Sequence, residues 1–242
     1  MRRLLLPVVA TLLTAACSTA ASTPGDSAST VSTPSASATP TTSASSTPAV
    51  GAARTTRQVV FFGDSYFVGG GCSPKRSRDM AAIAGNLLGY RPVVRGFGGT
   101  GFVATNPDYG GPDYLTQVTG GALAADHPSL VVIEGGDNDI GFPVDQIDQQ
   151  ARKVLKFAQH LYPDANLVLM GAMQTYGDFS QTDGINTGLR AVAKKLGVSF
   201  INPQKWTFGH DDYLCSDYVH PTYDAHQILG AKLAKKLAKR GA

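Results

Sequence analysis

Residues 58–65 read Gln-Val-Val-Phe-Phe-Gly-Asp-Ser, an apolar run that ends in a glycine and two small polar residues. An unbroken run of Val and Phe is typical of a strand that is buried on both faces. The glycine allows a tight turn, and Asp and Ser favour the start of a helix. This stretch therefore predicts a buried strand that leads directly into a helix.

Four further apolar runs repeat the strand-like pattern, at residues 92–95, 130–134, 167–170 and 198–201. Helical patterns lie between and after these runs, at residues 78–88, 144–162, 186–196 and 223–239. Short runs rich in Val, Ile and Phe that alternate with amphipathic helices indicate a parallel sheet covered on both faces. We therefore expect an α/β fold, a three-layer α/β/α sandwich with a central parallel sheet.

The first 56 residues differ in composition from the rest of the chain. Residues 1–17 combine two arginines, a short apolar run and small residues, which is the layout of an export signal. They end in Thr-Ala-Ala-Cys17, which looks like a bacterial lipobox and predicts a lipid anchor at Cys17 on the outer side of the cell membrane; plain secretion is the alternative. Residues 18–56 are mostly Ser, Thr, Pro and Ala, so we expect a disordered linker. The folded domain is expected at residues 57–242.

The charge of the chain gives no sign of a nucleic-acid partner. The formal net charge is +3 at pH 7, and it falls to about +1 when the N-terminal 56 residues are set aside. The basic residues near the C-terminus favour the negative end of the last predicted helix, and we interpret them as a solvated surface. We expect no nucleic-acid partner, and we expect a monomer.

Four short motifs supply candidate chemistry: Gly63-Asp64-Ser65, Gly96-Phe97-Gly98-Gly99, Asp137-Asn138-Asp139 and Asp217-Tyr218-Val219-His220. The first three each follow a predicted strand, and ligands of parallel α/β sheets bind beyond the carboxyl ends of the strands. Block for block, the four motifs resemble those of the SGNH (GDSL-type) esterase and lipase superfamily. The resemblance covers the chain from about residue 58 onward and implies a flavodoxin-like strand order.

The resemblance also implies roles for three residues. Ser65 matches the family's nucleophile, which attacks an ester carbonyl once a base takes its proton. His220 matches that base, and Asp217 matches the carboxylate that orients it. An ordinary helix cap formed by Asp64-Ser65 and a surface turn around His220 are the alternative interpretations.

Three oxyanion donors follow from the same resemblance. They are the Ser65 backbone N–H, the Gly99 backbone N–H and the Asn138 side-chain amide. A shift of one residue, to Gly98, stays open for the glycine. An ordinary turn is the alternative for Asn138, and we expect Asp139 to cap the segment that follows it.

One competing motif lies in the same region. Residues 96–101 satisfy the pattern G-x-G-x-x-G after a strand, as in dinucleotide-binding proteins. That pattern binds phosphate only where it opens a helix. The prolines and glycines in residues 103–120 argue against a helix there, so we expect no dinucleotide cofactor.

Two cysteines, Cys72 and Cys215, remain in the predicted domain. Export would permit them to pair. If the resemblance holds, both lie at the rim of the active site, and a disulfide would tie the nucleophile loop to the base loop. Two buried free thiols are the alternative.

Metal and cofactor sites have weak candidates only. The loop at residues 210–212 combines a histidine with two aspartates, and residues 137–141 faintly resemble a calcium loop, but both lack the further ligands that such sites need. We expect no metal and no cofactor. Glu134, the only glutamate, stands in a run that should be buried, and it is expected either to pair with a cation such as Arg95 or to face the cleft.

The substrate is the least determined feature. Five aromatic residues are candidates for lining an acyl or sugar site, although packing roles are equally common: Tyr66, Phe67, Phe102, Tyr109 and Tyr114. We expect hydrolysis of acyl or acetyl esters on cell-envelope or extracellular glycans or lipids. An acyltransferase that uses the same acyl-enzyme and an inactive glycan-binding lipoprotein are the alternatives.

Overall fold

The computed structural model describes residues 57–72, 76–175 and 179–241. Within them, five parallel strands form one sheet: β1 (Gln58–Gly63), β2 (Arg91–Gly96), β3 (Leu130–Glu134), β4 (Asn166–Met170) and β5 (Ser199–Ile201). The strand order is β2-β1-β3-β4-β5, which is the flavodoxin-like order. The predicted α/β fold is confirmed. The predicted export signal, Cys17 and the linker lie outside the described residues.

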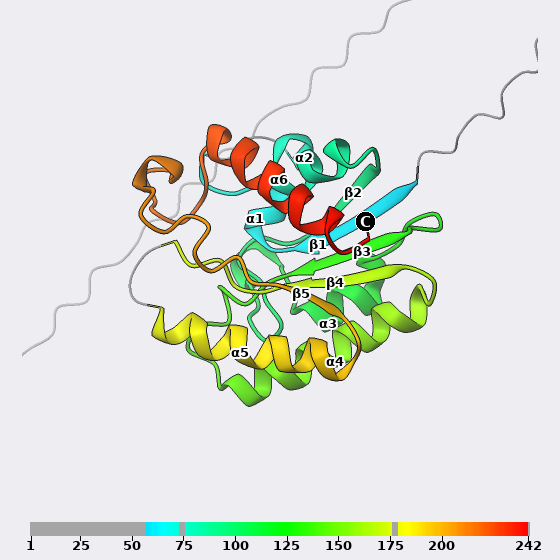
Figure 1. The fold of residues 1–242 in the computed structure, drawn as a ribbon. Coiled ribbons are helices and arrows are strands. Elements are labelled where there is room, and N and C mark those ends of the chain that lie inside the picture. The colour runs from blue at the N-terminus through cyan, green and yellow to red at the C-terminus, as the bar shows by residue number, and fades with distance from the viewer. Residues whose placement is uncertain (1–56, 73–75, 176–178, 242) are drawn as a thin grey trace, which may run out of the picture. The chain divides into compact units, whose positions relative to one another are not determined.

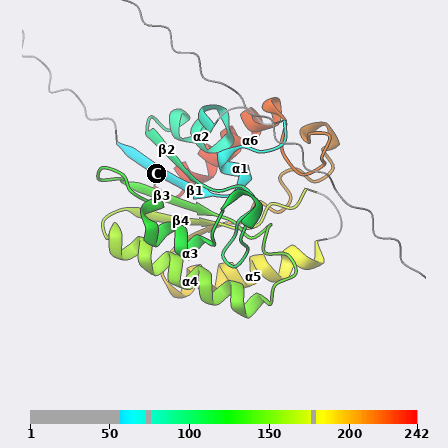
Figure 2. The ribbon, with the colours of Figure 1, turned by 180° about the vertical axis from the view of Figure 1, so that it is seen from behind.

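Helices cover both faces of the sheet. They are α1 (Ser65–Val68), α2 (Met80–Leu87), α3 (Tyr114–Gln117), α4 (Val144–Leu161), α5 (Ser180–Lys195) and α6 (Tyr223–Ala238). Helices α1, α2 and α6 lie on one side, and α3, α4 and α5 lie on the other (Figures 1 and 2). None of the helices in the described part of the chain is long and apolar enough to cross a membrane.

Strand β1 shows why the sheet needs two helical layers. Its four apolar side chains are all fully buried. Val60 and Phe62 pack into the cluster on the α4 and α5 side, whereas Val59 and Phe61 pack into the cluster on the α2 and α6 side. Successive side chains of a strand point to opposite faces, so an unbroken apolar run requires cover on both.

The structure corrects the start of one predicted helix and adds one helix that was not predicted. Helix α5 begins at Ser180, six residues before the predicted start. The prediction missed this first turn because its residues are polar, although Thr182 within it is fully buried. A helix also forms where none was expected, α3, whose N-cap Asp113 accepts a hydrogen bond from the Thr116 N–H. It does not follow the glycines of residues 96–101 directly, so the argument against a dinucleotide site still applies.

Helix α6 is tied to α2 by a buried histidine. The His226 Nδ1 atom accepts a hydrogen bond from the Met80 backbone N–H at 3.0 Å. Burial lowers the pKa of His226 to about 4, so the ring is neutral at pH 7 and free to accept. This contact sets the position of the start of α6, and the loop that carries His220 leads into that start.

Candidate active site

The predicted nucleophile lies at the turn between β1 and α1. Ser65 is the first residue of α1 and is partly exposed. Asp64 caps the helix, because its Oδ1 atom accepts a hydrogen bond from the Tyr66 N–H at 3.0 Å. Backbone N–H groups in the first turn of a helix have no acceptor within it, so the Ser65 N–H suits an oxyanion. The capping interpretation of this motif and a nucleophilic Ser65 are therefore compatible.

The predicted base and orienter form a close pair on the loop before α6. His220 Nδ1 lies 2.8 Å from Asp217 Oδ2. The other carboxylate oxygen, Oδ1, accepts the backbone N–H groups of Val219 at 2.9 Å and of His220 at 3.0 Å. Burial works to raise the pKa of Asp217, but these hydrogen bonds outweigh it and lower the pKa to about 2. Asp217 is therefore a carboxylate at neutral pH, as an orienter must be.

Gly70, which none of the four motifs includes, lies between Ser65 and His220. A Cβ atom added at Gly70 would overlap His220 Nε2 and lie 3.0 Å from Ser65 Cβ. The next residue, Gly71, has a φ of +57°, and a Cβ there would overlap the Asp217 carboxylate. Ser65 and His220 thus border the same small space, which only glycine leaves open. The run of three glycines at residues 69–71 was the signal that could have revealed this.

The structure contains the predicted disulfide between Cys72 and Cys215. It follows directly on the glycine run, and the Cys215 N–H donates to the His220 carbonyl oxygen at 2.8 Å. The disulfide therefore joins the segment beside Ser65 to the loop that holds His220. The alternative of two free thiols is wrong.

Both candidate oxyanion glycines lie in the turn after β2. A Cβ atom added at Gly98 would lie 3.5 Å from Ser65 Cβ, so this residue packs against the predicted nucleophile. Gly99 has a φ of +73°, and a Cβ there would overlap the Asn106 amide that donates to the Gly98 carbonyl oxygen at 2.9 Å. Both glycines stay candidates. Gly98 packs against Ser65, and Gly99 has a positive φ and no room for a side chain beside Asn106.

Asn138 reaches the same place from the loop after β3. Its Nδ2 atom donates to Asp64 Oδ2 at 2.9 Å and to the Thr100 carbonyl oxygen at 3.0 Å. These two bonds use both amide hydrogens. Asn138 can serve as an oxyanion donor only if one hydrogen turns from its present acceptor toward the substrate.

Asp139 does not cap the segment that follows it, so that prediction is wrong. Its carboxylate accepts the backbone N–H groups of Phe102, Val103 and Ala104 at 2.8 to 2.9 Å. Each of these bonds has a charged acceptor, so together they hold the Asp139 side chain on this loop. The loop after the glycine turn is thereby fastened to the loop that carries Asn138.

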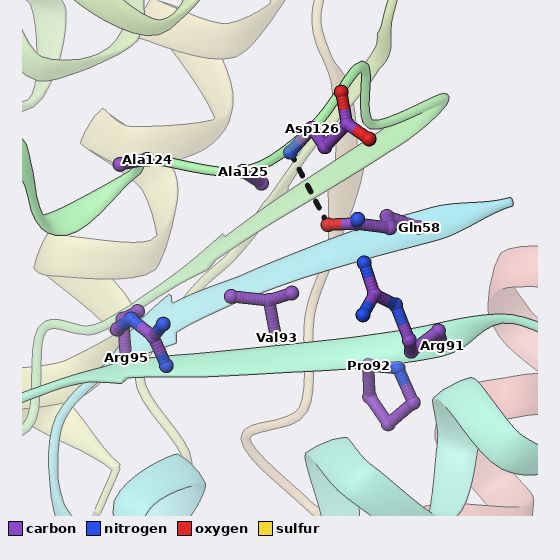
Figure 3. Close-up of a pocket in the computed structure, with 8 residues that line it drawn as sticks. All are labelled: Gln58, Arg91, Pro92, Val93, Arg95, Ala124, Ala125 and Asp126. Atoms are coloured by element: carbon purple, nitrogen blue, oxygen red, sulfur yellow. Dashed lines mark hydrogen bonds between the residues drawn. The ribbon is translucent and has the colours of Figure 1, made fainter.

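Glu134 neither pairs with Arg95 nor faces an open cleft. It is fully buried at the end of β3, and its Oε2 atom accepts the Asp64 N–H at 3.2 Å. Arg95 instead donates to the Val94 carbonyl oxygen. Figure 3 shows its side chain at one end of an open groove of about 320 Å³ along the edge strand β2. No candidate catalytic residue lines that groove.

The five aromatic candidates mostly serve packing. Phe67, Phe102 and Tyr114 are fully buried in the two cores. Tyr66 is buried too, and its ring centre lies 6.5 Å from that of His220, under the candidate site. Only Tyr109, with 77% of its surface exposed, is available to a large substrate.

No metal-binding cluster of three or more His, Cys, Asp or Glu side chains occurs in residues 57–72, 76–175 and 179–241. His210 stacks on Tyr213 with ring centres 4.3 Å apart. Asp139, from the motif that faintly resembles a calcium loop, is used by three backbone amides.

Comparison with known proteins finds solved structures with a similar fold. The chain resembles a carbohydrate esterase family 2 enzyme with a carbohydrate-binding domain from Corynascus thermopiles (Myceliophthora fergusii), at 25% identity and a TM-score of 0.64 over 76% of this chain and 66% of that one. It also resembles the carbohydrate acetylesterase Est24 from Sinorhizobium meliloti, at 18% identity and a TM-score of 0.59 over 76% of this chain and 99% of that one. The psychrotrophic esterase EstA from Pseudoalteromonas sp. has 15% identity and a TM-score of 0.62 over 76% of this chain and 97% of that one.

The match to the carbohydrate esterase family 2 enzyme is partial, since this chain spans slightly less than two thirds of its length. No sequence among the curated proteins matches this chain. The family model of the GDSL-like lipase/acylhydrolase family matches residues 61–228, which include all four motifs. The chain therefore belongs to the GDSL-like lipase/acylhydrolase family, within the SGNH hydrolases.

Proposed function

We propose that this protein is a serine esterase that hydrolyses carboxylic esters through an acyl-enzyme. The observation that carries the proposal is the Asp217–His220 pair at 2.8 Å, whose second ring nitrogen borders the same glycine as Ser65. A carboxylate on Nδ1 keeps that nitrogen protonated and leaves Nε2 free to accept the serine proton. Membership of the acylhydrolase family supports the same reaction class.

The reaction divides into two steps at Ser65. His220 Nε2 takes the proton of the Ser65 hydroxyl as the oxygen attacks the ester carbonyl carbon. The protonated ring then gives that proton to the leaving alcohol, and the acyl group stays on Ser65. Water, deprotonated by the same ring, releases the acid in the second step. The oxyanion of each intermediate is stabilised by the Ser65 N–H, by the N–H of Gly99 or Gly98, and by a turned Asn138 amide.

The proposed substrates are acyl or acetyl esters on glycans or lipids outside the cell. Two of the structural relatives are described as a carbohydrate esterase and a carbohydrate acetylesterase. The export signal and Cys17 anticipated in the sequence would place the enzyme at the cell envelope, and a disulfide suits an oxidising compartment. Transfer of the acyl group to a second alcohol, rather than to water, would use the same residues.

A fluorophosphonate tests the proposal directly, because it bonds covalently to activated serines. The wild-type protein should be labelled at Ser65, and Ser65→Ala should lose both label and ester turnover by several orders of magnitude. Ser77→Ala, which changes an exposed serine, is the matched control. Turnover of aryl esters of graded length, beside acetate release from acetylated glycans, then separates acyl-chain preference from glycan preference. Equal activity in Ser65→Ala would refute the esterase assignment.

A further inference from the structure

The end of β3 holds a buried acid that the proposed reaction does not use. Glu134 is fully buried, and its Oε2 atom accepts the Asp64 N–H at the turn that carries Ser65. Gly63 makes room for it, because a Cβ atom at residue 63 would overlap the same Oε2 atom. Glu134 therefore packs against the turn between β1 and α1 that carries Ser65.

The surroundings of Glu134 are acidic. Two further carboxyl groups, those of Asp137 and Asp139 in the loop after β3, lie close enough to act on the charges of Glu134 and Asp64. The other ionisable groups nearby are those of Tyr66, Tyr114 and His220. No Lys or Arg among the described residues forms an ion pair with Glu134. Burial, followed by the charge of Asp64, raises the pKa of Glu134 well above its ordinary value. An isolated buried carboxylate would be very costly, so the neutral acid is favoured.

The hydrogen bonds agree with a neutral acid. Among the described residues, one hydrogen bond reaches the Glu134 carboxyl group, from the Asp64 N–H to Oε2 at 3.2 Å, and a neutral carboxyl group can accept it. The remaining oxygen, Glu134 Oε1, is buried without a hydrogen-bond partner. A neutral C=O oxygen tolerates that situation far better than a charged oxygen does.

Asp64 connects Glu134 to Asn138, the candidate oxyanion donor. Its Oδ1 atom caps α1 through the Tyr66 N–H, and its Oδ2 atom accepts the Asn138 amide at 2.9 Å. We propose that Glu134 is a positioning residue of the esterase: as a neutral acid it accepts the Asp64 N–H, and so holds the Ser65 turn and, through Asp64, the Asn138 amide in place. The inference rests on the proposed function for its catalytic meaning but not for its protonation state.

The protonation state can be measured without any substrate. Glu134 is the only glutamate in the chain, so glutamate labelled with carbon-13 at the side-chain carboxyl and incorporated by cell-free synthesis yields one protein carboxyl signal. At about pH 6 an ordinary glutamate is almost fully ionised. We expect the Glu134 signal at the position of a protonated carboxyl at that pH, and its titration only at higher pH. A signal at the ionised position at pH 6 would overturn the proposal.

Two substitutions test the positioning role. Glu134→Met keeps a similar volume but removes the hydrogen bond from the Asp64 N–H, and we expect kcat to fall by about 10² with little change in KM, since displacements of about 1 Å cost that much. Glu134→Gln is neutral, and its amide oxygen can still accept the Asp64 N–H. It should recover most of the lost kcat and keep the wild-type pH profile.

The outcomes separate the two hypotheses. Full kcat in Glu134→Met, or a loss in Glu134→Gln as large as in Glu134→Met, would refute the positioning role while Ser65 stays essential. Should the Met variant fail to fold, the carbon-13 titration and the Gln variant decide the question. Ester turnover that survives in Ser65→Ala would refute the proposed function instead, and the carboxyl titration would remain valid.

Discussion

The two halves of the candidate active site are held in place by different means. Ser65 and Asn138 follow the ends of the buried strands β1 and β3, and every contact described for Asp64 and Glu134 beneath them is buried or partly buried. Asp217 and His220 lie on a loop where both side chains are partly open to solvent, 37% and 22% exposed. That loop is fixed by short-range hydrogen bonds and by the disulfide between Cys72 and Cys215.

Because the two halves are held differently, substitutions in them should affect catalysis in different ways. The nucleophile side is expected to stay in place as long as the sheet is intact, because Asp64 and Glu134, which hold it, are fully buried and hydrogen-bonded to it. The base side can move while the sheet stays folded, because few buried contacts hold it. Changes on the nucleophile side should therefore act through transition-state stabilisation, and changes on the base side through the approach of His220 to Ser65.

The largest effect is expected on the nucleophile side. Asn138→Ala removes a donor that is proposed to act mainly in the transition state, so kcat should fall by about 10² to 10³ with little change in KM. Steady-state kinetics on an aryl acetate measure it. Asn86→Ala, an exposed asparagine on α2, is the control and should behave as the wild type. A raised KM with unchanged kcat would make Asn138 a substrate-binding residue.

A second change probes the space between the two halves. Gly70→Ala adds a methyl group where His220 Nε2 now lies, so the ring must move away from Ser65. We expect kcat to fall by about 10² while the thermal unfolding temperature changes little. Gly184→Ala in α5, where the added atom meets only Val144 at 3.5 Å, is the matched control. Wild-type kcat in Gly70→Ala would mean that the ring works from another position.

Removal of the disulfide tests the base side alone. The double change Cys72→Ser and Cys215→Ser should lower stability by about 2 to 5 kcal/mol and kcat by about tenfold or more, with the far-ultraviolet circular dichroism of the sheet unchanged. Denaturant unfolding and kinetics measure the two effects. A reducing agent should change the wild type in the same direction and leave the double variant unaffected. An unaltered kcat would show that local hydrogen bonds suffice to hold His220.

The smallest effect is expected far from both halves, at His226. Burial lowers its pKa to about 4 from an ordinary 6.5, so on acidification the unfolded chain binds a proton before the folded chain does. The stability that the neutral ring contributes is complete above pH 6.5 and is lost between pH 6.5 and 4. His226→Gln should flatten the fall in unfolding temperature over that range without changing kcat at pH 8. His160→Gln, an exposed histidine of α4, should leave the fall unchanged.

Much of the fold followed from local pattern. The apolar runs predicted the cores of all five strands, most clearly β1 and β3, which are buried along their whole length. The first turn of α5 and the short helix α3 were not predicted, because neither shows an apolar periodicity. The first turn of α5 contains the buried Thr182, and α3 begins at its cap Asp113. The candidate site was outlined by its motifs, but Asp139 was misinterpreted and Gly70 was missed.

By itself, the sequence determined the order of strands and helices, the placement of the motifs Gly63-Asp64-Ser65 and Asp137-Asn138-Asp139 at strand ends, and the contrast between an N-terminal segment rich in small polar residues and a domain with a core. Those features are local, since they depend on composition and spacing within a few residues. Only the tertiary structure decided that Glu134 lies against Asp64, 70 residues away, and that His226 accepts from Met80, 146 residues away. Burial sets the charge of such groups, and burial is a property of the packed molecule, so no local pattern contains it.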